Sequence, residues 1–208
     1  MTPRRRLVDR EPAPLGRRLL AFAIDLAVVY VAVVVLLQLV LQPVTDLIGP
    51  GWTRVGWFFT AYTFLTMSVP ILLYFAGYEA SPHQAPPGKQ WLGMVVTDAA
   101  GERPGFGRVL LRTLVKLLPL ELARIALALP GNPFVDPLTS ELRMPGADAI
   151  TPFFLIGSIV ALILAGLYLL VAALDDDGRA PHDYLAGTYV LRAEATPSAR
   201  RTVLADGS

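Results

Sequence analysis

Three long runs of apolar residues alternate with shorter polar stretches along the chain. The runs cover residues 19–41, 55–77 and 152–174. A helix needs about 20 apolar residues to cross the hydrocarbon core of a bilayer, and each run is about that long. The first run lacks a small-residue cleavage site at its end, so we expect it to be retained as a helix. The pattern predicts an integral membrane protein of the all-α class.

A fourth stretch, residues 107–131, is amphipathic instead of uniformly apolar. Arg108, Arg112 and Lys116 recur every four residues and therefore share one face of a helix. One interpretation is a helix that lies in the membrane interface. The other is a further span, whose charged face is turned toward the inside of the bundle.

The distribution of basic residues favours the spanning interpretation. The segment before the first run contains Arg4, Arg5, Arg6, Arg10, Arg17 and Arg18. The C-terminal segment contains Arg179, Arg192, Arg200 and Arg201. Loop 131–150 holds Arg143 and three carboxylates. If residues 108–129 cross, the positive-inside rule is obeyed throughout. We therefore predict a four-helix transmembrane bundle with both termini in the cytoplasm.

The polar parts of the chain complete the predicted organisation. Residues 1–15 and 194–208 are expected to be disordered tails around a membrane domain at 16–193. Residues 91–97 and 185–194 resemble strands, and they can pair only if both lie on one side of the membrane. We expect a small two-stranded β element in the cytoplasm. Within the second run, Pro70 is expected to kink the helix or free a carbonyl.

Composition agrees with the membrane assignment and argues against an enzyme. The chain is 54% hydrophobic and 17% charged, against about 25% charged residues in soluble domains. It has no cysteine and two histidines, His83 and His182, which excludes disulfides and thiolate metal sites. No catalytic triad or paired acid and base is apparent. We expect no catalytic residues, no metal, no cofactor and no nucleic-acid partner.

Asp25 is the most unusual residue of the first run, because an unpaired carboxylate is costly in hydrocarbon. Arg18 shares its helix face but lies about 10 Å away along the axis, so the partner should come from another helix. Counting along residues 108–129 places Lys116 at the depth of Asp25, with Arg112 slightly nearer the inner boundary. We predict an inward-facing cluster of Arg18, Asp25, Arg112 and Lys116. It is either an ion site or an ion pair that fixes helix packing. Glu121 and Arg124 are expected to pair at spacing i,i+3.

Two motifs lie near the inner boundary. Gly88-Lys89 lacks the rest of a phosphate loop, so we expect a tight turn with Lys89 facing lipid headgroups. In His182-Asp183, the aspartate is expected to cap a helix or to pair with Arg179 or Arg108, while His182 remains a candidate group titrating near neutral pH. We also predict a hydrogen-bonded belt that ties the sheet to the helix ends, made of Arg18, Arg108, Asp183 and Thr188.

Three motifs in this order carry a family resemblance. They are "GRRLLAFAIDLAVVY", "QAPPGKQWLGMVVTDAAGERPGFGRVLLR" and "DDDGRAPHDYLAGTYVLRAE". Together they resemble the RDD family of small bacterial membrane proteins, whose arginine and two aspartates match Arg18, Asp25 and Asp183. The family turn has a threonine before Pro-Gly-Lys, where this chain has Pro86. The resemblance implies a multi-pass protein of the bacterial cytoplasmic membrane, with ligand transport or cation/proton exchange suspected in the family.

Two classes of function follow. The chain could transport, or assist transport of, a small ion or ligand through the charged cluster. Alternatively, it is a structural or regulatory membrane protein whose buried charges set helix packing and partner binding. The expected partners are the lipid bilayer and a second copy or other membrane proteins, because four helices form a thin bundle for a solute path.

Overall fold

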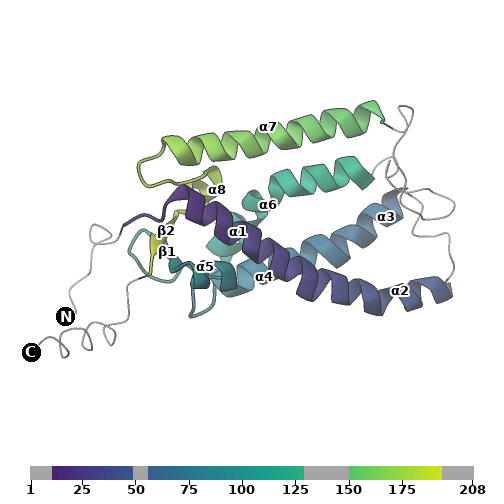
Figure 1. Cartoon of the computed structure of the whole chain (residues 1–208), viewed down its shortest axis with the longest axis horizontal. Helices are drawn as coiled ribbons and strands as arrows, with labels where there is room; N and C mark the ends of the chain where they lie inside the picture. The colour runs from purple at the N-terminus through teal and green to yellow at the C-terminus, as the bar shows by residue number, and fades with distance from the viewer. Residues whose placement is uncertain (1–10, 49–55, 129–149, 194–208) are drawn as a thin grey trace, which may run out of the picture.

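The computed structural model describes residues 11–48, 56–128 and 150–193 (Figure 1). Predictions for residues 1–10, 131–149 and 194–208 therefore lie outside the described residues. The described chain is mostly helical, with one small sheet. The long helices run along the long axis of the molecule, and the sheet lies at one end of it (Figure 1).

Three helical stretches of the described chain are long and apolar enough to cross a membrane: Leu15–Leu41, Thr60–Glu79 and Pro152–Leu174. The first stretch lies within a continuous helix formed by α1 (Leu15–Val29), η2 (Tyr30–Val35) and α2 (Leu36–Ile48). The second lies within the helix formed by α3 (Gly56–Thr63), η4 (Phe64–Ser68) and α4 (Val69–Glu79), and the third is α7 (Pro152–Leu174). The three apolar runs of the sequence therefore form the expected helices.

The irregularity expected at Pro70 takes the form of a π-helical turn, η4, which ends just before α4. A proline has no N–H to donate to the carbonyl four residues earlier, here that of Thr66. The wider turn accommodates this missing bond. The Thr66 hydroxyl in turn donates to the carbonyl of Tyr62 at 2.8 Å.

Helix α6 (Phe106–Ala128) is the amphipathic stretch, and it lies beside α7 (Figure 1). Pro119 leaves the Val115 carbonyl without its helical donor, and the hydroxyl of Tyr168 on α7 donates to that oxygen at 3.0 Å. A Cβ added to Gly157 of α7 would lie 2.6 Å from the Cβ of Ala126. The glycine therefore permits the close packing of α6 on α7.

The polar end contains α5 (Pro87–Trp91), β1 (Met94–Asp98), α8 (Pro181–Ala186) and β2 (Thr188–Arg192). The strands pair antiparallel, from Met94 opposite Arg192 to Asp98 opposite Thr188. This confirms a two-stranded sheet, but both strands start later than predicted. Trp91 belongs to α5, and Leu185 and Ala186 belong to α8.

Part of the predicted N-terminal tail joins the sheet. The Ala13 N–H donates to the Val190 carbonyl at 3.0 Å, and the Arg192 N–H donates to the Glu11 carbonyl at 3.1 Å. Ala13 and Val190 also share a small buried core with Met94. These contacts attach the start of α1 to β2.

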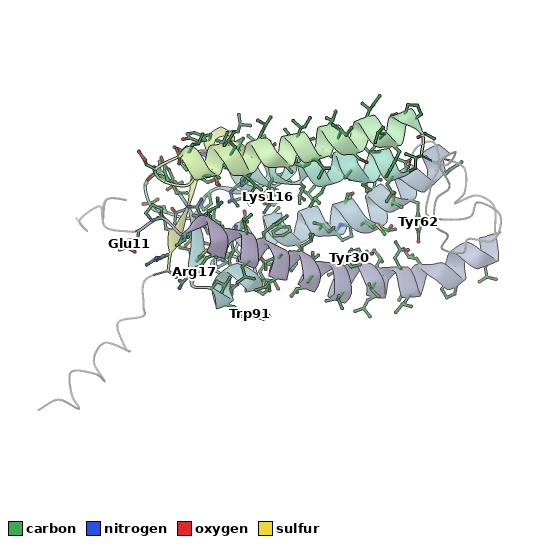
Figure 2. The ribbon with its side chains drawn as sticks, turned by 45° about the horizontal axis from the view of Figure 1, so that its top comes forward. Glu11, Arg17, Tyr30, Tyr62, Trp91 and Lys116 are labelled. Carbon is green, nitrogen blue, oxygen red and sulfur yellow. The ribbon has the colours of Figure 1, made fainter. Side chains whose placement is uncertain are left out.

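The helices expose apolar side chains on their outer faces (Figure 2). On α7, Leu162, Ile163 and Leu170 are all more than half exposed. Helix α6 shows leucines in the same way, among them Leu114. In contrast, its basic residues Arg112 and Lys116 point inward and are buried. The polar interior and apolar exterior are the arrangement that a lipid environment requires.

Candidate functional site

Glu79, the last residue of α4, is the acidic centre of the site and is fully buried. Its Oε1 accepts from Lys89 Nζ at 2.7 Å and from Lys116 Nζ at 3.2 Å. Its Oε2 accepts from Arg112 Nη1. Burial of an ion costs several kcal/mol unless partners compensate for the lost hydration. Here α5 and α6 supply three cations to one carboxylate.

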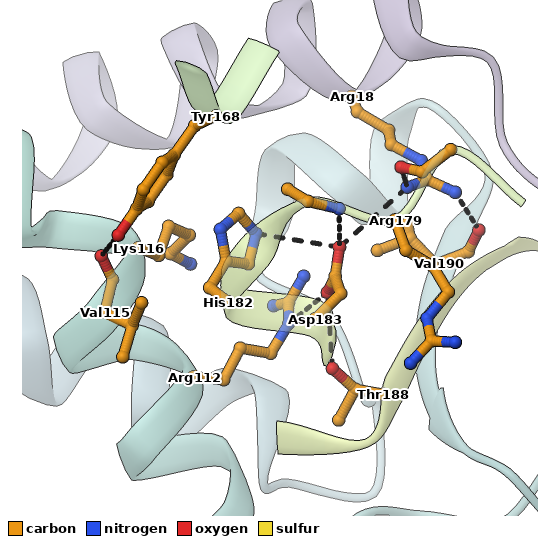
Figure 3. Close-up of polar contacts among 12 residues, drawn as sticks. Arg18, Arg112, Val115, Lys116, Tyr168, Arg179, His182, Asp183, Thr188 and Val190 are labelled. Carbon is orange, nitrogen blue, oxygen red and sulfur yellow. Dashed lines mark hydrogen bonds and ion pairs between the residues drawn. The ribbon is translucent and has the colours of Figure 1, made fainter. Parts of the chain in front are cut away.

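Asp183 is the second buried carboxylate, on the short helix α8 (Figure 3). Its Oδ1 accepts from Arg112 Nε at 2.8 Å and from Thr188 Oγ1 at 3.2 Å. Its Oδ2 accepts from the Ala180 N–H at 3.3 Å. Burial raises the pKa of Asp183, but the charges of Arg112 and Arg18 and the hydrogen bond from Arg112 act together against burial, and this pKa lies well below its usual range. Arg112 therefore bridges carboxylates from α4 and α8.

Asp25 on α1 has different partners from those predicted. Its Oδ1 accepts from the backbone N–H of Gly88 at 2.6 Å and from the hydroxyl of Tyr74 at 3.2 Å. Its buried Oδ2 has no hydrogen-bond partner in the described part of the chain. The predicted direct pairing of Asp25 with Lys116 is replaced, because Lys116 bonds Glu79.

Gly88 is required where α5 meets α1. A Cβ at this position would lie 2.6 Å from the Ala21 carbonyl oxygen and 2.8 Å from Asp25 Oδ1. The Pro-Gly-Lys motif therefore forms the start of the short helix α5, pressed against α1, where a tight turn was expected. Lys89, expected to face headgroups, is 5% exposed and points to Glu79 instead.

Arg18 connects α1 to the polar end through backbone carbonyls. Its guanidinium donates to the carbonyls of Gly178, Asp177 and Val190, the last at 2.8 Å. Its Nη1 lies 4.0 Å from Asp183 Oδ2, at the outer limit of an ion pair (Figure 3). The arginine thus holds the turn after α7 and strand β2 against the first helix.

The predicted belt is present in part. Arg18 and Thr188 both approach Asp183, but Arg108 does not. The Arg108 side chain is 60% exposed and lies 4.0 Å from Asp98. One helical turn separates it from Arg112, which takes the position expected for Arg108. The spacing of four placed these residues on one face, but it did not show which of them reaches the interior.

His182 is buried beside Asp183, with Nε2 3.7 Å from Oδ2. Burial is the main cause that lowers its pKa to about 3; the charge of Asp183 acts in the opposite direction, and the charges of Arg112, Lys116 and Lys89 act in the same direction as burial. The imidazole is therefore neutral near pH 7, so the expected titration near neutral pH is wrong. Within the described ranges, no group of three or more His, Asp or Glu side chains could hold a metal ion.

A second polar group lies further along the bundle. Arg124 Nε bonds Glu121 at 2.6 Å, as the i,i+3 spacing predicted. Ser68 donates to the same carboxylate, at 2.8 Å to Oε2, and Arg124 Nη1 donates to Thr63 Oγ1 at 2.8 Å. Polar side chains from α3, η4 and α6 therefore continue the buried polar contacts away from the sheet.

We define the charged centre as seven side chains at the sheet end. Its cations are Arg18, Lys89, Arg112 and Lys116, and its carboxylates are Asp25, Glu79 and Asp183. It adjoins a cavity of about 260 Å³ between α1, α6, α7 and α8. With four cations and three carboxylates, the centre carries an excess of one positive charge.

Glu79 and Lys89 are the members that sequence reasoning missed. Glu79 lies just beyond the predicted second run, which ends at residue 77, and Lys89 is expected from the sequence to face lipid headgroups. One feature of the sequence does indicate the contact of Glu79. Glu79 and Arg112 both lie near the ends of their helices that adjoin the predicted sheet, so a count along each axis places them at one level.

Comparison with known proteins identifies a family for this chain. The sequence profile of the RDD family matches residues 12–187, which is most of the chain. No curated protein and no solved structure gives a significant match. Arg18, Asp25 and Asp183, which carried the resemblance in the sequence, all lie in the charged centre. The chain belongs to the RDD family of membrane proteins.

Proposed function

We propose that the chain transports, or assists transport of, a small ion or ligand through the charged centre, and is not an enzyme. It acts as a multi-pass protein of the bacterial cytoplasmic membrane, with four crossings and both termini in the cytoplasm. The observation that carries this proposal is the charged centre itself. It is buried among α1, α4 and α6 and adjoins a cavity that its cations line.

The sheet supports four crossings. Strand β1 follows α4 and precedes α6, while β2 follows α7 by way of α8. Since β1 and β2 pair, the end of α4, the start of α6 and the end of α7 lie together (Figure 1). Helix α6 has 23 residues, or about 35 Å at 1.5 Å per residue, which exceeds the hydrocarbon core of about 30 Å.

The absence of cysteine makes the topology testable. Two variants each carry one cysteine, at Ser140 or at Ser198. An impermeant maleimide is added to intact cells or to inverted vesicles that contain one of the variants. Ser140→Cys should label from outside and Ser198→Cys from the cytoplasmic side, while the unaltered chain reports background labelling. If both positions label from outside, four crossings are wrong.

Transport is supported by the polar interior and by the state of Asp25. One oxygen of Asp25 is bonded to Gly88 and Tyr74, and the other is buried without a hydrogen-bond partner among the described residues. A carboxylate of this kind is suited to exchange a proton or a cation. Beyond it, Glu121 and Arg124 line a further part of the interior.

Flux measurements test the transport proposal. Purified chain in proteoliposomes is compared with Asp25→Asn, using a pH-sensitive dye and imposed sodium, potassium or chloride gradients. Asp176→Asn is the matched control, because Asp176 is an exposed carboxylate in the turn after α7. We expect flux for the unaltered chain and the control, and a loss of at least tenfold for Asp25→Asn. Identical flux in all three ends the transport proposal.

A structural or regulatory role is the second candidate, and the contacts of Glu79 favour it. Three cations already occupy this carboxylate, which suits a fixed link between α4, α5 and α6. In this case Asp25→Asn changes assembly or detergent stability and not flux.

Because four helices form a thin bundle, transport would favour a homo-oligomer or a complex with another membrane protein. The mass of the complex in detergent, measured by light scattering, distinguishes one copy from several.

A further inference from the structure

The cavity next to the charged centre has a mostly apolar lining, to which Phe22, Leu120 and Leu169 contribute. Polar side chains line only its inner wall, among them Arg18, Lys116 and His182. Leu169 on α7 and Leu19 on α1 line the cavity and are each 43% exposed. The apolar walls therefore continue onto the outer faces of α1 and α7, and the cavity opens toward the side of the bundle.

Polar atoms of the inner wall have unused hydrogen-bonding capacity. Lys116 has three N–H donors; among the described residues its ammonium group makes one hydrogen bond, to Glu79, and lies 3.8 Å from the ring centroid of Phe75 and 6.0 Å from that of Phe22. Arg18 Nε and His182 Nδ1 are buried and have no hydrogen-bond partner within the described chain. Buried polar groups are normally paired, so these atoms point to a ligand.

The nitrogens of His182 indicate what kind of group it would accept. Nε2 faces the carboxylate of Asp183 at 3.7 Å, which favours placing the single proton of the neutral ring on Nε2. Nδ1 is then an acceptor. In Figure 3 it lies on the side of the ring that faces Lys116 and Tyr168. An acceptor at this position requires a donor such as a hydroxyl group on the ligand.

The charge of the site restricts the charge that the ligand can carry. The charged centre has an excess of one positive charge, so a ligand with one negative charge would make it neutral. If the ligand also carried a positively charged group, that group would lie near Lys116 and Arg18, which would repel it. These features together fit a phosphodiester that carries a hydroxyl.

We propose that the cavity binds the headgroup of an anionic glycerophospholipid, with the phosphate on Lys116 and Arg18 and a headgroup hydroxyl on His182 Nδ1. The acyl chains lie outside, along the exposed leucines of α1 and α7. A volume of about 260 Å³ is slightly below the usual range of ligand pockets, about 300–1,000 Å³, which suits a headgroup and not a whole lipid. A soluble phosphate would leave the apolar walls without a partner.

This inference rests on the proposed placement of the sheet end at a membrane boundary, where headgroups lie. It does not depend on transport, since a lipid bound here can stabilise the bundle without moving. Cysteine labelling tests the placement, flux tests transport, and lipid binding tests the inference, so each failure is distinguishable from the others.

The first experiment needs no variant. Delipidated protein in detergent is titrated with short-chain phosphatidylglycerol, phosphatidylcholine or inorganic phosphate, and binding is measured by native mass spectrometry and thermal stabilisation. We expect phosphatidylglycerol to bind at least tenfold more tightly than phosphatidylcholine, because Lys116 and Arg18 repel the choline cation of the second lipid. Equal binding of the two lipids, or equally tight binding of inorganic phosphate, overturns the proposal.

A cavity-filling variant then locates the site. Ala165 on α7 lines the cavity, whereas Ala173 on the same helix is exposed and does not. Ala165→Phe should weaken phosphatidylglycerol binding at least tenfold without changing any charge, and Ala173→Phe should leave it unchanged. Unaltered binding by folded Ala165→Phe would place the lipid elsewhere and overturn the proposal.

The role of His182 is tested with two lipids of equal charge. Phosphatidylethanol has the phosphodiester of phosphatidylglycerol but no headgroup hydroxyl. The unaltered chain should prefer phosphatidylglycerol by about fivefold, the scale of one neutral hydrogen bond, and His182→Phe should lose this preference while retaining an anionic lipid. An unchanged preference in the variant overturns the contact with His182.

Discussion

The charged centre and the Glu121–Arg124 pair place charges inside the same bundle in two different ways. In the centre, Glu79 and Arg112 are 33 residues apart, and their side chains are 0% and 2% exposed. Glu121 and Arg124 are three residues apart on one helix and are 23% and 16% exposed. The first is a tertiary contact that depends on the fold, whereas the second is a local contact available to the helix alone.

This difference predicts which charged side chains are essential for folding and assembly. Removing one member of a fully buried group leaves its partners uncompensated, while a partly exposed pair is partly solvated by water or by headgroups. Substitutions in the charged centre should therefore affect folding and assembly much more than substitutions in the local pair.

The largest effect is expected for Arg112→Met. Methionine has a similar length but leaves Asp183 without its main cation and Glu79 with two of its three. Removal of one partner from a buried pair costs about 3–5 kcal/mol. We expect little folded protein in detergent extracts, measured by size-exclusion chromatography. Arg108→Met is the matched control, because Arg108 is exposed on the same helix. A normal yield for Arg112→Met would contradict the bridge.

Acidification should destabilise the centre through His182. Burial lowers the pKa of His182 to about 3 in the folded chain, below the usual value of about 6.5. As pH falls from about 6.5 toward 3, the unfolded chain therefore binds a proton at His182 and the folded chain does not. The free energy of unfolding then decreases by up to about 1.4 kcal/mol per pH unit. His182→Gln should flatten this slope, as measured by unfolding in detergent at pH 7, 6 and 5.

The other histidine provides the control for this experiment. His83 lies in the exposed turn after α4, so His83→Gln should keep the pH dependence of the unaltered chain. The same slope in both variants would show that His182 is not the group responsible.

A smaller effect is expected for Gly88→Ala. The added methyl group would meet the Ala21 carbonyl and Asp25, and insertion of a methyl group into a tight contact costs about 1–3 kcal/mol. The unfolding midpoint in detergent should fall. Gly77→Ala is the comparison, because a Cβ at Gly77 meets nothing within 4 Å. Equal midpoints for the two variants would mean that α5 does not press on α1.

The smallest effect is expected for Glu121→Gln. The side chain keeps an acceptor for Ser68 and Arg124, and the pair is partly exposed, so the loss should be about 1 kcal/mol or less. The loss is measured as the difference in unfolding free energy between the variant and the unaltered chain in an SDS titration. A loss as large as that of Arg112→Met would remove the distinction between the two regions.

Local rules predicted much of the fold. The apolar runs identified the three helices, the missing N–H of Pro70 identified an irregular turn, and the i,i+3 spacing identified the Glu121–Arg124 pair. Each depends on residues within one or two helical turns. The motifs around Arg18, Asp25 and Asp183 also sufficed to indicate the family.

The contacts of the charged centre could not be predicted in the same way. Asp25 is bonded to the backbone N–H of Gly88, and no pattern of side chains shows a backbone donor. Lys89 turns inward because α5 packs on α1, a contact that requires the whole fold. Glu79 lies two residues beyond the predicted second run, although it is the shared partner of three cations.

The coupling between Glu79 and Arg112 tests the central claim most directly. A double-mutant cycle uses Glu79→Gln, Arg112→Gln and the combination, with unfolding free energies measured in detergent. We predict a coupling energy above about 2 kcal/mol, because contacting groups of one network are not additive. The same cycle on Glu121 and Arg124 should give about 1 kcal/mol or less. Additive losses at Glu79 and Arg112 would contradict the account of the charged centre.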